Sequence, residues 1–460
     1  MLDRNISRIL GIMMKTPRYK EYAYSVPDLE SHAQFARKAA SEGMVLLKNK
    51  KQALPLTRGD ARVAAFGNAA YEIIIGGTGS GDVNEAYTIS LREGLDNAGF
   101  EPDAELGETY LAYMEEARAN LGPSQNPIAA LLGVSDPLPE MPVTESLAQQ
   151  AAASTDVALI TVGRNAGEGV DRQAVEGDFY LTEVEKEMII NVSDAFHAAG
   201  KKTIVILNIA GVIETASWRD IPDAILCAWQ PGQEAGNAIM DVISGKVNPS
   251  GKLASTFPVS YEDAPTVKNF PGTAIEEEGL PESPPMEVLY EEDIYVGYRY
   301  YNTFDVPVAY EFGYGLSYTG FEYTNLVIEN PDFNGTLNFS VEVKNSGAVA
   351  GKEAVQVYIS APGEDMDKPA RELVDFGKTG LLQPGESQTL EFVINTADIA
   401  SFDQESSSWE AEAGEYALKV GASSLDMRQT GTFSLSKAMN AGTVSRSLLP
   451  EKEINRIYEN

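Results

Sequence analysis

Cysteine and histidine are almost absent from this chain of 460 residues, which contains one cysteine and two histidines. A single cysteine cannot form an intrachain disulfide, and Cys227 lies in the apolar run 224–229, where a free cysteine packs as a small hydrophobic residue. Neither His32 nor His197 is paired with another ligand at the spacing of a metal site. The sequence therefore predicts no metal and no other cofactor. With so few His and Cys residues, hydrolysis through a Ser-His or Cys-His pair is disfavoured. Carboxylates are therefore the favoured catalysts.

Basic residues are also scarce, because 35 Lys and Arg stand against 68 Asp and Glu, for a formal net charge of −33. Such a charge repels phosphate backbones and anionic bilayers, so neither nucleic acid nor a membrane is an expected partner. Long apolar stretches are missing, and a membrane-spanning helix needs about 18 such residues. Arg4 and Arg8 interrupt the apolar positions of the N-terminus, which is unlike a signal peptide. We therefore expect a cytoplasmic location.

Short continuous apolar runs alternate with helical stretches over the first half of the chain. Continuous runs indicate strands buried on both faces, and their alternation with helices predicts a layered α/β sandwich with a mainly parallel sheet. Strands are expected at 62–67, 157–163, 203–208 and 224–229, and helices at 182–199, with Thr182 as N-cap, and at 232–244. In such sheets ligands gather at the loops that follow the strand C-termini.

Other stretches are interpreted from spacing and composition. A short amphipathic helix is expected at 2–15, and a longer helix from Asp28 to Asn49. Residues 101–150 contain several prolines and are interpreted as an irregular insertion, whereas the Pro- and Glu-rich stretch 262–287 resembles a linker.

From about residue 321 the apolar period changes to two, as in 337–343 and 354–359, and Gly-containing turns separate the runs. This pattern predicts a β-sandwich. The expected division of the chain is then a first helix with a linker at 1–30, the α/β sandwich at 31–262, a linker at 263–320, the β-sandwich at 321–435 and a tail at 436–460.

Two glycine-rich loops follow predicted strands. In the loop 76–82, backbone amides and the Ser80 hydroxyl can approach a ligand closely, although a purely structural turn is the alternative. Phosphate binding is disfavoured, because the loop lacks the lysine of a nucleotide-binding loop. In the loop 163–172, Glu168 can protonate a leaving oxygen, or it is simply a solvated loop charge. Asp171 and Arg172 are expected to form a local ion pair.

Seven segments occur in the order found in glycoside hydrolase family 3 of the β-glucosidase type, and the chain resembles that family over nearly its whole length. They are 36–49 (ARKAASEGMVLLKN), 77–81 (GTGSG), 167–172 (GEGVDR), 229–234 (WQPGQE), 248–258 (NPSGKLASTFP), 295–301 (YVGYRYY) and 312–318 (FGYGLSY). The resemblance implies that the α/β sandwich is followed by an all-β, immunoglobulin-like sandwich of the fibronectin type III-like kind. The N-terminal TIM barrel of the family is not represented.

The resemblance also implies roles for individual residues. Glu168 corresponds to the general acid/base of a retaining mechanism, and Ser80 corresponds to a serine that contacts the sugar. The family's nucleophilic Asp lies in a barrel motif absent from this sequence, and the helix at 2–15 resembles the last barrel helix. A β-glucosidase that acts on glucosides or oligosaccharides with a terminal β-linked glucose is therefore expected, with the TIM barrel either on a partner chain or lost.

Two alternatives remain open from the sequence. The first is a non-catalytic carbohydrate-binding or scaffold protein derived from such an enzyme. The second is a nucleophile elsewhere in this chain, for which the acidic run Glu291, Glu292 and Asp293 offers candidates. The simpler interpretation of that run is a solvated charged segment.

Overall fold

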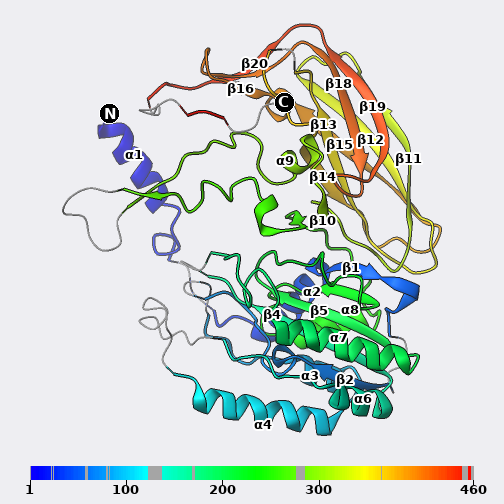
Figure 1. Ribbon diagram of the computed structural model, residues 1–460. Coiled ribbons are helices and arrows are strands. Elements are labelled where there is room, and N and C mark those ends of the chain that lie inside the picture. The colour runs from blue at the N-terminus through cyan, green and yellow to red at the C-terminus, as the bar shows by residue number, and fades with distance from the viewer. Residues whose placement is uncertain are drawn as a thin grey trace.

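The computed structural model describes residues 2–21, 23, 25–56, 61–78, 81, 83–122, 137–167, 171–275, 285–363, 365–447 and 454–456. An α/β unit and a β-sandwich lie one above the other in Figure 1, with a less regular segment between them. The predicted fold class is confirmed for both parts.

The α/β unit is built on a six-stranded sheet in the order β1-β6-β5-β4-β2-β3. Its strands are β1 (Val45–Asn49), β2 (Arg62–Phe66), β3 (Glu101–Pro102), β4 (Val157–Arg164), β5 (Lys202–Ile209) and β6 (Ala224–Cys227). Every neighbouring pair is parallel except β1 and β6. The central strands are buried along nearly their whole length, as their continuous apolar runs predict.

Successive side chains of each strand enter two separate apolar cores, one on each face of the sheet. Phe66 and Ile160 pack on one face with α4 (Ala104–Asn120), α6 (Glu145–Ser154) and α7 (Glu183–Ala198). Ala65 and Leu159 pack on the other face with α3 (Leu91–Asn97) and α8 (Ala235–Ile243), and α2 (Leu29–Gly43) lies beside α8. The sheet is therefore the middle layer of three (Figure 1).

Two predictions for this unit were wrong. The helix expected from Asp28 to Asn49 ends at Gly43, because Met44 is already extended and Val45–Asn49 pairs with β6 as strand β1. The stretch 101–150 is also not an irregular insertion. Its described residues contain α4 and the beginning of α6, and both helices cover one face of the sheet.

Helices α3 and α8 approach each other through glycines. A Cβ at Gly236 would lie 1.9 Å from the carbonyl oxygen of Ser90, and a Cβ at Gly94 would lie 2.4 Å from the backbone of Gly236. We expect Gly236→Ala to lower the free energy of unfolding by about 1–3 kcal/mol despite its better helix propensity, because the backbone contact must open. Urea denaturation measures this loss. In the control Gly43→Ala, the new Cβ would meet nothing within 4 Å. A loss no larger than that of the control would contradict this prediction.

The β-sandwich consists of two main antiparallel sheets. One contains β11 (Phe321–Ile328), β12 (Thr336–Asn345) and β15 (Ser387–Asn395), and the other contains β14 (Glu372–Lys378), β13 (Ala354–Ser360), β18 (Gly414–Gly421) and β19 (Met427–Leu435). In β12 the alternate residues Leu337, Phe339, Val341 and Val343 are buried, as the period of two predicts. A third sheet joins β16 (Ser401–Asp403), β17 (Ser408–Ala411) and β20 (Met439–Thr443).

The segment between the two units has structure of its own. It includes β7 (Phe257–Pro258) paired with β10 (Val308–Tyr310), β8 (Thr273–Ala274) paired with β9 (Met286–Glu287), and α9 (Tyr298–Thr303). Glu292 is buried and accepts a hydrogen bond of 2.6 Å from Asn269 Nδ2, so the solvated acidic run expected at this place is wrong for Glu292. The ion pair of Lys252 with Glu353, at 3.2 Å, connects the segment that follows α8 to the β-sandwich.

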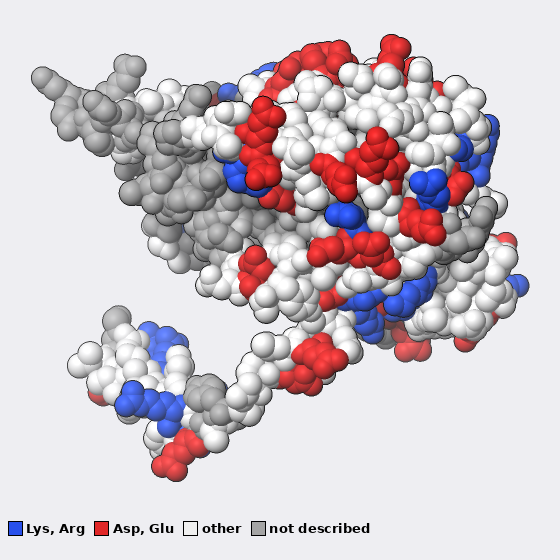
Figure 2. All heavy atoms as spheres, turned by 90° about the horizontal axis from the view of Figure 1, so that it is seen from below, with Lys and Arg blue, Asp and Glu red and all other residues white. Residues whose placement is uncertain are grey.

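Helix α1 (Leu2–Met13) stands apart from both units in Figure 1, and none of its residues is buried. In the part of the chain that the structure describes, no helix combines the length and apolarity needed to cross a bilayer. Carboxylates are scattered over the face seen in Figure 2, with fewer Lys and Arg between them, in keeping with the net charge of −33.

Candidate functional site

The strand order places two loops at a point where ligands commonly bind α/β sheets. After β2 the chain passes through α3 to β3 on one side, and then through α4 and α6 to β4 on the other side. The loops that leave the C-terminal ends of β2 and β4 therefore lead to helices on opposite faces of the sheet, which makes this edge its topological switch point. These are the two glycine-rich loops that the sequence analysis singled out.

The described parts of the two loops are bonded to each other. The backbone N–H of Thr78 donates to the carbonyl oxygen of Ala166 at 3.0 Å, and Thr78 and Gly167 form a parallel β-bridge. The contact leaves no room for side chains, because a Cβ at Gly167 would lie 1.9 Å from Thr78 Oγ1 and one at Gly77 would lie 2.9 Å from the Ala166 oxygen. Glycine at these positions is what permits the two loops to touch.

Gln230, which follows β6, forms hydrogen bonds to both loops. Its Nε2 donates to the carbonyl oxygen of Gly76 and to Oδ1 of Asn165, both at 3.0 Å. The preceding residue, Trp229, has a positive φ of 57°, an unusual backbone conformation for a bulky side chain, and it redirects the chain at the end of the strand. The amide of one side chain therefore contacts both loops.

Asn208 on β5 is fully buried, and both the oxygen and the nitrogen of its side-chain amide form hydrogen bonds. Its Nδ2 donates to the carbonyl oxygens of Ile74 and Trp229, each at 2.8 Å, and its Oδ1 accepts from the Ile74 N–H at 2.7 Å. A buried amide that pairs with backbone groups in this way fixes the stem of the first loop relative to the end of β6.

Arg172 holds the far end of the second loop. Its Nη1 donates to the carbonyl oxygen of Asn165 at 3.3 Å and to the carboxylate of Asp178, while its own carbonyl oxygen accepts from the Tyr261 hydroxyl at 2.9 Å. The predicted ion pair with Asp171 was therefore wrong. Asp178 is the better partner because it can also accept the Gln173 N–H, at 2.6 Å, so that it holds two neighbouring residues of the chain.

The two residues predicted from the sequence to act at this site, Glu168 and Ser80, lie outside the described residues. Their described neighbours Gly167 and Thr78 are bonded to each other, as given above. Sequence reasoning missed Asn208 and Gln230. A polar residue at the end of an otherwise apolar strand run was the available signal for Asn208.

A buried ion pair lies at the C-terminal end of β4. Arg164 and Glu185 make two hydrogen bonds of 2.6 Å each, and their side chains are 7% and 6% exposed. Glu185 also completes the capping box of α7 with Thr182, which confirms the predicted N-cap. Arg164 donates further to the carbonyl oxygens of Gly163 and Asp178, at 2.7 and 3.0 Å, so it connects β4, the segment after the second loop and α7.

Glu140 contacts the beginning of the first loop. Its carboxylate accepts the backbone N–H of Asn68, at 3.0 and 3.1 Å to its two oxygens, and that of Met141 at 3.0 Å. Burial raises the pKa of Glu140 from 4.5 to about 7, and these hydrogen bonds offset only part of the effect. The first turn after β2 therefore rests on a carboxyl group that titrates near neutral pH.

The folded chain binds the proton of the Glu140 carboxyl group more tightly than the unfolded chain does. This proton therefore adds to the free energy of unfolding. The contribution is complete below pH 4.5 and is lost as the pH rises through about 7. This loss of stability amounts to up to about 3 kcal/mol. We expect Glu140→Gln to abolish it, because the amide does not titrate but keeps one acceptor oxygen. The free energy of unfolding from urea titrations at several pH values between 5 and 8 measures the difference. The exposed Glu187→Gln is the control, and a pH profile unchanged by Glu140→Gln would contradict the assignment.

Among the described residues, no group of three or more His, Cys, Asp and Glu side chains is placed to hold a metal ion. The described residues at the switch point offer backbone amides, glycines and the side-chain amides of Asn165 and Gln230. Such groups suit the hydroxyls of a neutral, polar ligand.

Comparison with known proteins covers both parts of the chain. The glycosyl hydrolase family 3 C-terminal domain matches residues 44–318, and the fibronectin type III-like domain matches residues 353–424. Beta-glucosidase 3B from Thermotoga neapolitana, solved in complex with alpha-D-glucose, is similar with 46% sequence identity and a TM-score of 0.86, over 94% of this chain and 58% of that one.

Curated relatives also match most of this chain and about half of their own length. Beta-glucosidase A of Butyrivibrio fibrisolvens is 36% identical over 92% of this chain and 53% of its own length. An exo-alpha-(1->6)-L-arabinopyranosidase of Bifidobacterium breve is 31% identical over 94% of this chain and 53% of its own length. The chain thus spans about half the length of the curated relatives it matches.

Proposed function

Because this chain belongs to glycosyl hydrolase family 3, we propose that it is the acid/base-carrying half of a retaining β-glycosidase, with a β-glucoside as substrate. Several similar proteins are named beta-glucosidases, which favours glucose as the sugar. In this proposal the α/β sandwich at 31–262 carries the acid/base, the β-sandwich at 321–435 supports it, and residues 263–320 link them. The cytoplasmic location stays a prediction.

In the proposed reaction, Glu168 gives its proton to the glycosidic oxygen as the bond from that oxygen to the anomeric carbon breaks. A carboxylate nucleophile forms a bond to the same carbon at the same time, and the aglycone leaves as an alcohol. Glu168, now ionised, then takes a proton from water, which attacks the anomeric carbon as the bond from this carbon to the nucleophile breaks. The sugar is released and the nucleophilic carboxylate is restored. Ser80 is proposed to contact the sugar. The nucleophile is an Asp of a TIM barrel that is not among these 460 residues.

The observation that carries this proposal is the contact between the two loops at the switch point. Thr78 and Gly167 are paired, and Gln230 contacts both loop stems, so the residues next to Ser80 and Glu168 share one edge of the sheet. A sugar contact and a proton donor must both reach one pyranose ring, and the contact between the two loop stems supports this part of the proposal.

Complementation tests the proposal. The chain is assayed on an aryl β-glucoside alone, and again after addition of the separately expressed part of Thermotoga neapolitana beta-glucosidase 3B that lies outside the match. We expect no turnover by either part and turnover by the mixture. Turnover by this chain alone would overturn the proposal that the nucleophile lies on a separate barrel, because a carboxylate within this chain would then act as the nucleophile. A stable complex that remains inactive, yet binds glucose, would instead favour a non-catalytic carbohydrate-binding protein.

A further inference from the structure

The residues that lead into the first glycine-rich loop are bonded directly to the sheet. Ile74 exchanges hydrogen bonds of 2.7 and 2.8 Å with the buried side-chain amide of Asn208 on β5. The carbonyl oxygen of Ile75 accepts the N–H of Gly232, in the segment after β6, at 2.9 Å. None of these bonds involves the second loop. The stem of the first loop is therefore held by the sheet alone.

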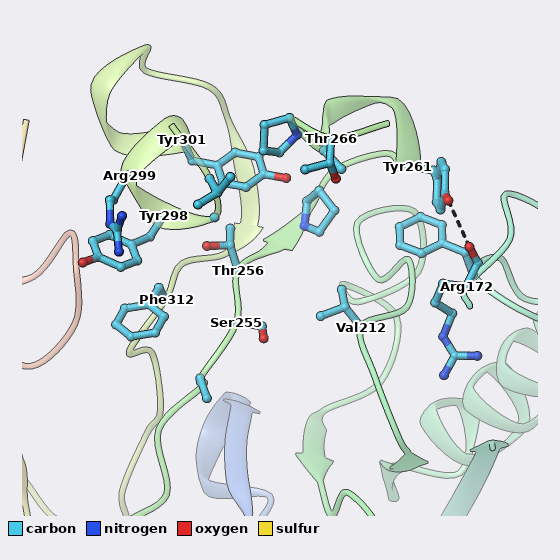
Figure 3. Close-up of a pocket in the computed structure, with 17 residues that line it drawn as sticks. Arg172, Val212, Ser255, Thr256, Tyr261, Thr266, Tyr298, Arg299, Tyr301 and Phe312 are labelled. Carbon is cyan, nitrogen blue, oxygen red and sulfur yellow. Dashed lines mark hydrogen bonds between the residues drawn. The ribbon is translucent and has the colours of Figure 1, made fainter. Parts of the chain in front are cut away.

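The base of the second loop is closed by Arg172. Its Nη1 donates to the carbonyl oxygen of Asn165 at 3.3 Å, which joins the two ends of the loop. Asp178 and Tyr261 hold Arg172 in turn. Figure 3 shows the bond from the Tyr261 hydroxyl to the backbone of Arg172, with the guanidinium group directed away from Tyr261. These contacts close the loop base, but none of them reaches the first loop.

Thr78 and Gln230 connect the two loops. The N–H of Thr78 donates to the carbonyl oxygen of Ala166 at 3.0 Å. Gln230 Nε2 donates to the carbonyl oxygen of Gly76 and to Oδ1 of Asn165, each at 3.0 Å. A primary amide has two N–H groups, so Gln230 uses one on each loop. Its side chain therefore sets the spacing between the first loop and the base of the second.

Gln230 stands on the same support as the first loop. The carbonyl oxygen of the preceding residue, Trp229, accepts Asn208 Nδ2 at 2.8 Å, and Asn208 also holds Ile74. The start of the first loop and the segment after β6 thus form one unit, from which the Gln230 amide extends to Asn165. Removing that amide should release the second loop and leave the first loop in place.

We propose that Gln230 is a positioning residue, which fixes the base of the second loop against the first and so sets where Glu168 stands relative to Ser80. The statement about Glu168 rests on the proposed function, whereas the statement about the loops does not. A proton donor must lie within hydrogen-bond reach of the leaving oxygen, and a misplacement of about 1 Å can cost about 10²-fold in rate. Loss of the Gln230 amide should therefore impair proton transfer more than sugar binding.

Hydrogen exchange of the whole chain tests the loop contact without any turnover. Gln230→Met keeps nearly the same length but cannot donate. We expect the N–H of Thr78 to exchange at least about fivefold faster in this variant, because its acceptor Ala166 follows Asn165 in the released loop. The N–H of Ile74, held by Asn208, should exchange at an unchanged rate. Mass spectrometry with single-residue fragmentation measures both amides.

Kinetics of the complemented enzyme test the effect on Glu168. On an unactivated β-glucoside, Gln230→Met should lower kcat about 5- to 50-fold and change KM less than about twofold. On a dinitrophenyl β-glucoside, kcat/KM should fall less than about threefold, because this leaving group departs without a proton. A purely structural loss of active enzyme would lower both equally.

Gln230→Glu provides a second variant of the same shape. Its carboxylate would face the oxygens of Gly76 and Asn165, so it should be at least as damaging as Gln230→Met at about pH 8. Relative to the unsubstituted enzyme it should recover in part at about pH 5, where a protonated carboxyl group can donate once more. No such recovery is expected for Gln230→Met.

Gln150→Met is the matched control, because it removes a hydrogen bond of 3.1 Å to Glu105 between exposed side chains on α6 and α4. It should change neither the exchange rates nor the kinetics. An unchanged rate at Thr78 in Gln230→Met would overturn the proposal, and so would an equal acceleration at Ile74. Equal losses on the two substrates, or a higher KM with the same kcat, would overturn the positioning of Glu168. If the complementation mixture shows no turnover, the proposed function fails, while hydrogen exchange still decides whether Gln230 holds the loops together.

Discussion

Replacing Glu168 by glutamine is expected to lower kcat of the complemented enzyme on an unactivated β-glucoside by roughly 10²- to 10⁴-fold, because an amide neither gives nor takes the required proton. The loss should shrink on a dinitrophenyl β-glucoside, whose leaving group departs without protonation. On that substrate, added azide should restore part of the rate, since an anionic nucleophile needs no general base to attack the glycosyl intermediate. Steady-state rates with and without azide measure all three effects.

The exposed Glu108→Gln on α4 is the control for this experiment. An equal loss on both substrates, with no response to azide, would contradict the proton-transfer role and indicate a Glu168 that only contacts sugar. An unchanged rate would remove Glu168 from the mechanism altogether. The pattern across substrates is thus more informative than the loss of activity alone.

Replacing Arg164 by methionine is expected to destabilise the α/β unit by about 3–5 kcal/mol, because it leaves the buried carboxylate of Glu185 without its counter-ion. The two side chains are 7% and 6% exposed and share two hydrogen bonds of 2.6 Å. Glu185 in turn completes the cap of α7, so the same change should loosen the start of that helix. Urea denaturation followed by circular dichroism measures the loss.

Two further variants make this test specific. Arg118→Met breaks an ion pair with Glu72 whose side chains are 53% and 56% exposed, and it should cost less than about 1 kcal/mol. The double variant Arg164→Met with Glu185→Leu removes both buried charges and should recover much of the lost stability. If Arg164→Met were no more damaging than Arg118→Met, the buried pair would not be what holds this end of β4 in place.

The sequence by itself determined those features that depend on nearby residues. Runs such as 204–207 are apolar at every position, and such a strand buries all its side chains only between two layers, so β5 and the mainly parallel sheet were predictable. The alternation of 337–343 leaves one face apolar, which identified β12 and the sandwich. The cap of α7 needs only Thr182 and Glu185, three residues apart.

Only the tertiary structure decided which distant segments meet. Residues 45–49 have helical spacing, but pairing with β6 satisfies their backbone as a strand. Arg172 lies next to Asp171, yet Asp178 is held where it can bond both Arg172 and Gln173. Gln230 and Asn208 become part of the site because the strand order brings the ends of β5 and β6 to the two glycine-rich loops. Contacts between residues far apart in sequence depend on the order of strands in the sheet. The spacing of apolar and polar residues within one segment does not predict that order.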